Sequence, residues 1–244
     1  MVNKANAGAV DFSRRVAPKD LPELMDGPCS YEEFRGCLVD LEKVNRLSLG
    51  YRPTLSWLDD LVEHARTEKP LAIVDVGCGG GDMLRRVAAW ARKRGVAVKL
   101  TGVDLNPYAA RAAGEFARPG EEIEFVCGDA FSLEGEVDAV ISSLLTHHLE
   151  DVEIVRFVRW MEATARRGWF VNDLCRESTP YYWYNMGAKV LGWHRFLKHD
   201  GPVSFRRSFR EEDWRRMVGV AGIDGDEVSL RRWRPGRLCV GRLK

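Results

Sequence analysis

Residues 75–82 have the composition of a ligand-binding turn between a strand and a helix. One acid and three glycines stand at alternate positions, Asp75, Gly77, Gly79 and Gly81. Glycine lets a ligand approach the backbone with no Cβ in the way, and the first N–H groups of a helix lack partners within that helix. The pattern therefore predicts a small-ligand site where a strand gives way to a helix.

The spacing of these glycines distinguishes two cofactor classes. A dinucleotide fingerprint, Gly-x-Gly-x-x-Gly, would place its third glycine at position 82, where the chain has Asp82. This departure disfavours an NAD-dependent oxidoreductase. The pattern that is present, acid-x-Gly-x-Gly-x-Gly, resembles motif I of the class I S-adenosylmethionine-dependent methyltransferases. A carboxylate also suits S-adenosylmethionine, which carries a sulfonium and an ammonium.

The resemblance covers about residues 70–244 and implies a cofactor site, with S-adenosylhomocysteine as the product. Asp75 would help to hold the methionine ammonium, beside Gly77, Cys78 and Gly79. A second acid, Asp104, follows the next predicted strand at about the separation expected of a ribose-binding carboxylate. The further cofactor residues implied are Leu105, Asp129 and Ala130 at the nucleoside, and Ser143 at the methionine. Arg52, at the junction of the two N-terminal helices, could pair with the methionine carboxylate, although surface arginines are more often simply solvated.

Two adjacent histidines, His147 and His148, follow the predicted fourth strand. Methyltransferases of this class keep their reacting centre at the end of that strand. Either imidazole could take a proton from a phenol or hydroxyl during methyl transfer, because its pKa lies near neutrality. Either could instead orient a loop or bond a backbone carbonyl.

Apolar runs and amphipathic segments alternate along the central part of the chain. Strands are predicted at residues 71–76, 96–104, 123–127, 137–143 and 169–174, with helices between them. This order predicts a parallel sheet with right-handed crossovers. Segments 224–230 and 238–240 form a terminal hairpin that matches the antiparallel seventh strand of the family. The expected fold is α/β and Rossmann-like, with seven mostly parallel strands, N-terminal helices and a helical lid.

Two regions lie outside this alternation. Residues 1–69 are expected to form an arm and cap helices, one beginning at a Ser30–Glu33 capping box and the next near Pro53. Residues 70–244 then form the methyltransferase domain, with a lid insertion at about 175–205. The insertion is apolar on nearly all sides, so a lid, a dimer interface and a cap on the N-terminal helices are all compatible with it. The substrate residues proposed within it are Tyr181, Trp183 and Tyr184.

Composition excludes some partners. The formal net charge of +1 gives no reason to expect nucleic acid. Six cysteines show neither a C-x-x-C pair nor zinc-like spacing, so we expect reduced thiols, a cytoplasmic location and no metal. No apolar run approaches the roughly 20 residues of a membrane span. The expected state is a monomer or a homodimer.

The resemblance implies methyl transfer to a small aromatic or apolar acceptor. The aromatic insertion and the stretch at residues 199–204 resemble bacterial methyltransferases associated with type III polyketide synthases. This favours O-methylation of a phenolic compound in secondary metabolism. A C-methyltransferase of the quinone-biosynthesis type and a non-catalytic cofactor-binding protein are the alternatives.

Overall fold

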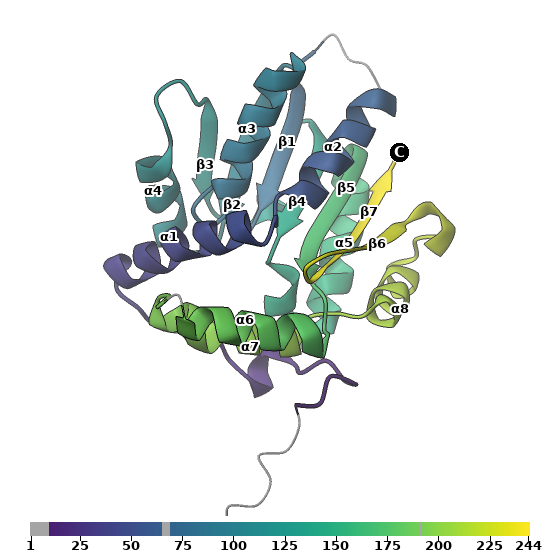
Figure 1. The fold of residues 1–244 in the computed structure, drawn as a ribbon. Helices are drawn as coiled ribbons and strands as arrows, with labels where there is room; N and C mark the ends of the chain where they lie inside the picture. The colour runs from purple at the N-terminus through teal and green to yellow at the C-terminus, as the bar shows by residue number, and fades with distance from the viewer. Residues whose placement is uncertain (1–9, 65–68, 191) are drawn as a thin grey trace, which may run out of the picture.

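A seven-stranded sheet forms the centre of the molecule (Figure 1). The computed structural model describes residues 10–64, 69–190 and 192–244. The strand order is β3-β2-β1-β4-β5-β7-β6, with β1 to β5 parallel and β7 antiparallel to β5. This confirms the predicted mostly parallel sheet, but the first strand of the terminal hairpin lies at Ser229–Trp233 and not at 224–230, where residues 225–227 form a 3-10 turn. The strands are β1 (Leu71–Val76), β2 (Val98–Asp104), β3 (Ile123–Cys127), β4 (Val137–Ser143), β5 (Ala165–Leu174), β6 (Ser229–Trp233) and β7 (Arg237–Leu243).

Helices cover both faces of the sheet and the end at which the parallel strands terminate (Figure 1). None of the helices in the described ranges is long and apolar enough to span a membrane. The α-helices are α1 (Tyr31–Leu47), α2 (Arg52–His64), α3 (Asp82–Arg94), α4 (Pro107–Phe116), α5 (Asp151–Thr164), α6 (Ser178–Val190), α7 (Arg195–Arg207) and α8 (Glu211–Ala221). The short 3-10 turns are η1 (Pro18–Asp20), η2 (Leu24–Asp26), η3 (Ala130–Ser132), η4 (Thr146–His148) and η5 (Gly225–Glu227).

The helix α2 belongs to the layers around the sheet. Its apolar stripe, which includes Trp57 and Leu58, packs in one buried cluster with Ile73 of β1 and Phe170 of β5. Trp57 stacks on Phe170 with ring centroids 5.3 Å apart. The expectation that both helices before the first strand only cap the sheet is therefore wrong for α2. The position of a helix in the sequence does not decide which part of the sheet its apolar side covers.

Three helices lie across the carboxyl ends of the parallel strands: α1, α6 and α7 (Figure 1). The predicted capping box of Ser30 and Glu33 starts α1. Ser208 and Glu211 have the spacing of a second capping box in the sequence, but they do not form one. Arg210 is the N-cap of α8, and Ser208 donates its hydroxyl proton to the Phe205 carbonyl. The aromatic insertion forms two packed helices, α6 and α7.

The N-terminal arm, residues 10–29, is packed against the rest of the protein. Arg15 donates to the Leu149 carbonyl at 2.6 Å and to Asp151 at 2.7 Å. Further along, the backbone N–H groups of Leu24 and Met25 donate to the carboxylate of Asp200 in α7. These contacts hold the arm across the mouth of the site, whereas residues 1–9 of the expected arm lie outside the described ranges.

Candidate active site

The glycine turn between β1 and α3 borders a cavity of about 390 Å³. Gly77, Gly79 and Gly81 all have positive φ, at 72°, 49° and 69°. A Cβ on Gly77 would lie 2.9 Å from the Leu145 side chain. Glycine is therefore required here both for conformation and for space. Residues 77–80 of the turn line the cavity, although the N–H groups of Gly77, Cys78 and Gly79 already donate to Val103 and Asp104.

Asp75 brings an unsatisfied carboxylate to this cavity. It lies at the end of β1 and only 1% of it is exposed, yet its Oδ1 has no hydrogen-bond partner among the described residues. Burial, together with the neighbouring charges of Asp82 and Asp104, raises the pKa of Asp75 well above its ordinary value. A cationic ligand group would relieve both penalties. The ammonium of S-adenosylmethionine fits this need.

Asp104 closes the turn from the neighbouring strand. It accepts hydrogen bonds from Gly79 N at 2.9 Å and from Asn106 N at 2.8 Å. Burial raises the pKa of this carboxyl. Because Asp104 borders both the first cavity and an adjoining one of about 270 Å³, the two form a continuous trough along the strand ends.

Most of the cofactor residues expected from the sequence line this trough. Asp75, Cys78, Gly79 and Ser143 border the first cavity, Asp129 and Ala130 border the second, and Gly77, Asp104 and Leu105 border both. Arg52 is the exception: it is exposed at the beginning of α2 and borders neither. The side chains of Tyr51 and Asn45, which both donate to Asp82, lie on the cavity side of that junction instead.

A separate apolar cavity of about 140 Å³ lies between α1, α7 and the end of β5. Leu174, Phe196, Phe205 and other apolar side chains form most of its wall. It meets the glycine-turn cavity at a boundary whose residues belong to both walls: Met25, Leu41, Asn45, Leu144 and His148. The arrangement offers a donor compartment and an acceptor compartment that touch.

The three lid aromatics proposed from the sequence have different positions. Tyr184 lines the apolar cavity, and its hydroxyl donates to the Leu197 carbonyl at 2.9 Å. Tyr181 packs against Phe12 of the arm and does not border the cavity. Trp183 is 66% exposed. The substrate prediction is not supported for Tyr181 and Trp183, because successive residues of a helix point in different directions and one face of α6 is turned away from the cavity.

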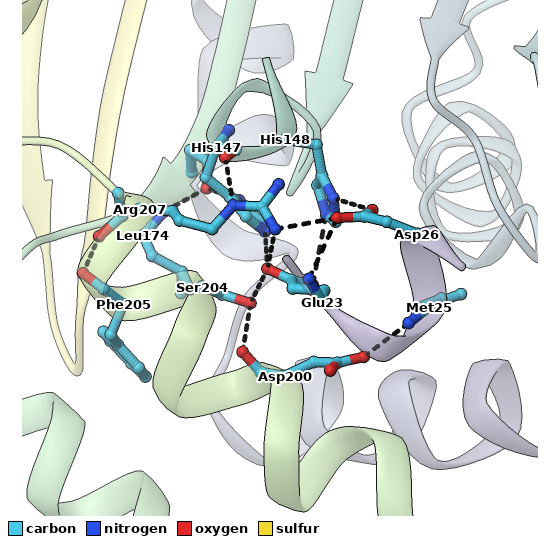
Figure 2. A network of polar contacts seen from close by, with 12 residues as sticks. Glu23, Met25, Asp26, His147, His148, Leu174, Asp200, Ser204, Phe205 and Arg207 are labelled. Atoms are coloured by element: carbon cyan, nitrogen blue, oxygen red, sulfur yellow. Dashed lines mark hydrogen bonds and ion pairs between the residues drawn. The ribbon is translucent and has the colours of Figure 1, made fainter. Parts of the chain in front are cut away.

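The two histidines, called the histidine pair below, lie in η4 at the polar end of the apolar cavity (Figure 2). His147 Nδ1 lies 2.7 Å from Asp173 Oδ1, and His148 Nδ1 lies 2.8 Å from Asp26 Oδ1. Burial alone would raise the pKa of Asp173, but the contact with His147 outweighs it and the pKa lies below its ordinary value. Both rings are therefore fixed in orientation by a carboxylate.

Glu23 faces the histidine pair from the arm (Figure 2). Its carboxylate oxygens lie 3.7 Å from the Nε2 atoms of both rings. Sequence reasoning missed Glu23 and Asp26, since nothing in their local pattern marks them, and it noted Asp173 only as the end of a strand. Within the described ranges, Glu23, His147 and His148 each place one potential metal-ligand atom within 4.8 Å of the other two.

A seven-stranded sheet with an antiparallel β7, a glycine turn after β1 and acids at the ends of β1 and β2 is the arrangement expected from the resemblance to the class I methyltransferases. Residues 73–168 match the methyltransferase domain family. With this domain, the chain is an enzyme that transfers a methyl group from S-adenosylmethionine.

Relatives and solved structures agree with this assignment. The chain is 26% identical to a ubiquinone biosynthesis O-methyltransferase of Thiobacillus denitrificans over 74% of this chain and 75% of the relative. It is 30% identical to a probable scoulerine-9-O-methyltransferase of Papaver somniferum over 64% of this chain but only 41% of that protein.

Two solved structures share the fold. The plantazolicin methyltransferase BamL, solved with a triazolic substrate analogue and SAH, superposes with a TM-score of 0.62 at 13% identity over 86% of this chain and 95% of that one. Human N-acetylserotonin methyltransferase with SAM gives 0.63 at 17% identity, over 88% of this chain and 56% of that one.

Proposed function

We propose that the protein O-methylates a phenolic, polyketide-like acceptor of secondary metabolism. The observation that carries this proposal is the apolar cavity, which meets the cofactor trough beside Leu144 and His148. Its wall of aromatic and aliphatic side chains suits a planar apolar molecule. The relatives named as O-methyltransferases support the choice of oxygen as the nucleophile.

Positioning supplies most of the rate in such a displacement. The acceptor oxygen attacks the methyl carbon opposite sulfur, so the new C–O bond forms as the C–S bond breaks. In this proposal Asp75 holds the ammonium of the donor and Asp104 its ribose. Tyr184 and Phe205 hold the ring of the acceptor, and α6 and α7 exclude water.

A neutral phenol is a weak nucleophile, so its proton must leave as the bond forms. His148 lies at the boundary of the two cavities and His147 lies in the wall of the apolar one, and the pair promotes this loss in our proposal. Arg237 lies in the same wall: it is 5% exposed and forms no ion pair with any described residue, donating instead to Asn45 Oδ1 at 2.8 Å. A buried, unpaired guanidinium favours an acceptor that becomes negatively charged.

The test is methyl transfer from labelled S-adenosylmethionine to a panel of phenols and resorcinols, with product structure determined by NMR. We expect O-methyl products, and at least about 100-fold slower turnover for His147→Ala and His148→Ala with cofactor affinity retained. His64→Ala, an exposed histidine of α2, is the matched control and should react like the wild type.

Other products would change the proposal. A methyl group on carbon would indicate the quinone-biosynthesis type of C-methyltransferase. Cofactor binding with no methylated product from any acceptor would indicate a binding protein. We further propose a cytoplasmic location, supported by six cysteines that are all free thiols. The proposed oligomeric state is a monomer or a homodimer.

A further inference from the structure

Three ligand-type atoms converge beside the apolar cavity without bonding to one another. The Nε2 atoms of the histidine pair each lie 3.7 Å from an oxygen of Glu23, beyond hydrogen-bond distance. These atoms all fall within 4.8 Å of one another. Figure 2 shows both rings and Glu23 directed toward a common point.

The Nδ1 atoms of both rings already have hydrogen-bond partners. Each Nδ1 meets a carboxylate, Asp173 for His147 and Asp26 for His148. A neutral imidazole that donates its Nδ1 proton in this way presents a lone pair at Nε2. A carboxylate that orients a metal-binding histidine through its second nitrogen is a recurrent arrangement in zinc proteins.

Carboxylates and one guanidinium surround the pair. The NH1 atom of Arg207 lies 2.9 Å from Asp26 and 3.4 Å from Glu23, and Ser204 also donates to Glu23. Asp173 accepts from the Thr146 hydroxyl and from His147 N, so all three carboxylates are held in place around the two rings.

The two rings, with centroids 4.3 Å apart, present both Nε2 atoms to the carboxylate of Glu23. One divalent ion would use both nitrogens and an oxygen of Glu23 as ligands. We propose that Glu23, His147 and His148 bind a divalent transition-metal ion, with Zn²⁺ the best match to two imidazoles and one carboxylate.

The separations of these atoms are near those of such a site. Ligand atoms bonded to tetrahedral zinc at about 2.0–2.1 Å lie roughly 3.4 Å apart. Each Nε2 lies 3.7 Å from a different oxygen of Glu23, so binding requires one oxygen and both nitrogens to move closer together. Three protein ligands leave a fourth position for water or substrate, and all three residues line the apolar cavity. The expectation of a metal-free protein is revised by this inference.

The ion also suggests how the acceptor loses its proton, and this part rests on the proposed function. A phenol oxygen in the fourth position would have a lowered pKa, so its proton passes to solvent and the bound phenolate attacks the methyl group. The C–O bond forms, the C–S bond breaks, and the positive charge of sulfur is discharged.

Metal binding can be tested without turnover. Purified protein is stripped with chelator and titrated with Zn²⁺, Co²⁺ or Mg²⁺ alone, and metal content, the visible spectrum of bound Co²⁺ and thermal stability are measured. We expect one Zn²⁺ or Co²⁺ per chain, a rise in melting temperature, and no comparable effect of Mg²⁺, which prefers oxygen ligands. The variants are Glu23→Gln and His148→Asn, with His64→Ala as the control.

Each outcome decides the assignment. Loss of bound Co²⁺ in both site variants, with retention in His64→Ala, supports it. No stoichiometric ion in the wild type, or equal binding by Glu23→Gln, overturns it. Glu23→Gln keeps the shape of the side chain, and circular dichroism of the chelated protein establishes that it is folded. A protein that binds the ion but methylates no phenol refutes the proposed function and leaves the metal site standing.

Discussion

Replacing Asp75 by asparagine should stabilise the empty protein and weaken its binding of cofactor. The carboxylate is 1% exposed and its Oδ1 has no partner among the described residues, so its charge is a cost until a cation arrives. Burial raises the pKa of Asp75, so removing its charge by Asp75→Asn should raise the free energy of unfolding at pH 7.

The loss of cofactor affinity follows from the same contact. A hydrogen bond to a charged group contributes about 1.5–3 kcal/mol, which corresponds to about 10- to 150-fold in Kd for S-adenosylmethionine. Calorimetric titration measures this loss, and urea unfolding measures the gain in stability. S-adenosylhomocysteine should lose affinity to a similar extent because it carries the same ammonium.

The pH dependence has a defined sign. The folded pKa of Asp75 lies above the ordinary value of 3.8, so the folded state holds this proton longer than the unfolded state does. The bound proton on Asp75 stabilises the folded state fully below about pH 4, and this stabilisation is lost as the pH rises through the folded pKa of Asp75. The advantage of Asp75→Asn over the wild type should therefore grow from pH 4 upward.

Asp138→Asn is the matched control. This carboxylate is also buried in a strand, but it accepts from Ala72 N at 2.9 Å and pairs with Arg166 and Arg167. Its replacement should destabilise the protein and leave cofactor affinity unchanged. Equal affinity of Asp75→Asn and the wild type for S-adenosylmethionine would refute the role assigned to Asp75, and a loss of stability in the empty variant would refute the account of its charge.

Two further comparisons test the turn and the lid. Gly77→Ala should lose both stability and cofactor affinity, because its φ is positive and its Cβ would meet Leu145. Gly95 also has a positive φ, but no atom lies near an added Cβ, so Gly95→Ala should lose about 1 kcal/mol of stability and keep its cofactor affinity. Equal cofactor affinity in the two variants would contradict a close approach of the cofactor to Gly77. Tyr184→Ala should raise KM for small phenols by enlarging the cavity, whereas the exposed Trp183→Ala should leave kinetics unchanged, and steady-state assays of both variants decide between a wall and a surface role.

The parts of the fold that depend on near neighbours could be predicted from the sequence. The capping box at Ser30, the N-cap at Asn106 and the limits of β1 and β4 all follow from residues a few positions apart. The glycine turn belongs to the same class, because its conformation is set by its own residue types. These signals are sufficient to indicate an α/β fold with a mostly parallel sheet.

The acceptor site depends on contacts between distant segments and could not be read in this way. Asp26 contacts His148 across 122 residues, and no pattern in the residues around Asp26 predicts the path of the arm that brings it there. The all-round apolar pattern of α6 likewise gave no means of telling Tyr184, at the cavity, from Trp183, in solvent. The cofactor residues were recovered because they cluster at the ends of consecutive strands, with Arg52 as the exception.

Different segments of the chain line the cofactor cavity and the apolar cavity, and this affects how related enzymes can change substrate. The segment that matches the methyltransferase family, residues 73–168, supplies the glycine turn, both strand-end acids and the histidine pair. The arm, α1 and α7, which lie outside that segment, supply most of the remaining wall of the apolar cavity. Of these segments, α7 borders the apolar cavity and not the glycine-turn cavity. Mutation of α7 can therefore alter acceptor choice while donor binding is inherited intact, so related enzymes could change substrate and keep their cofactor site.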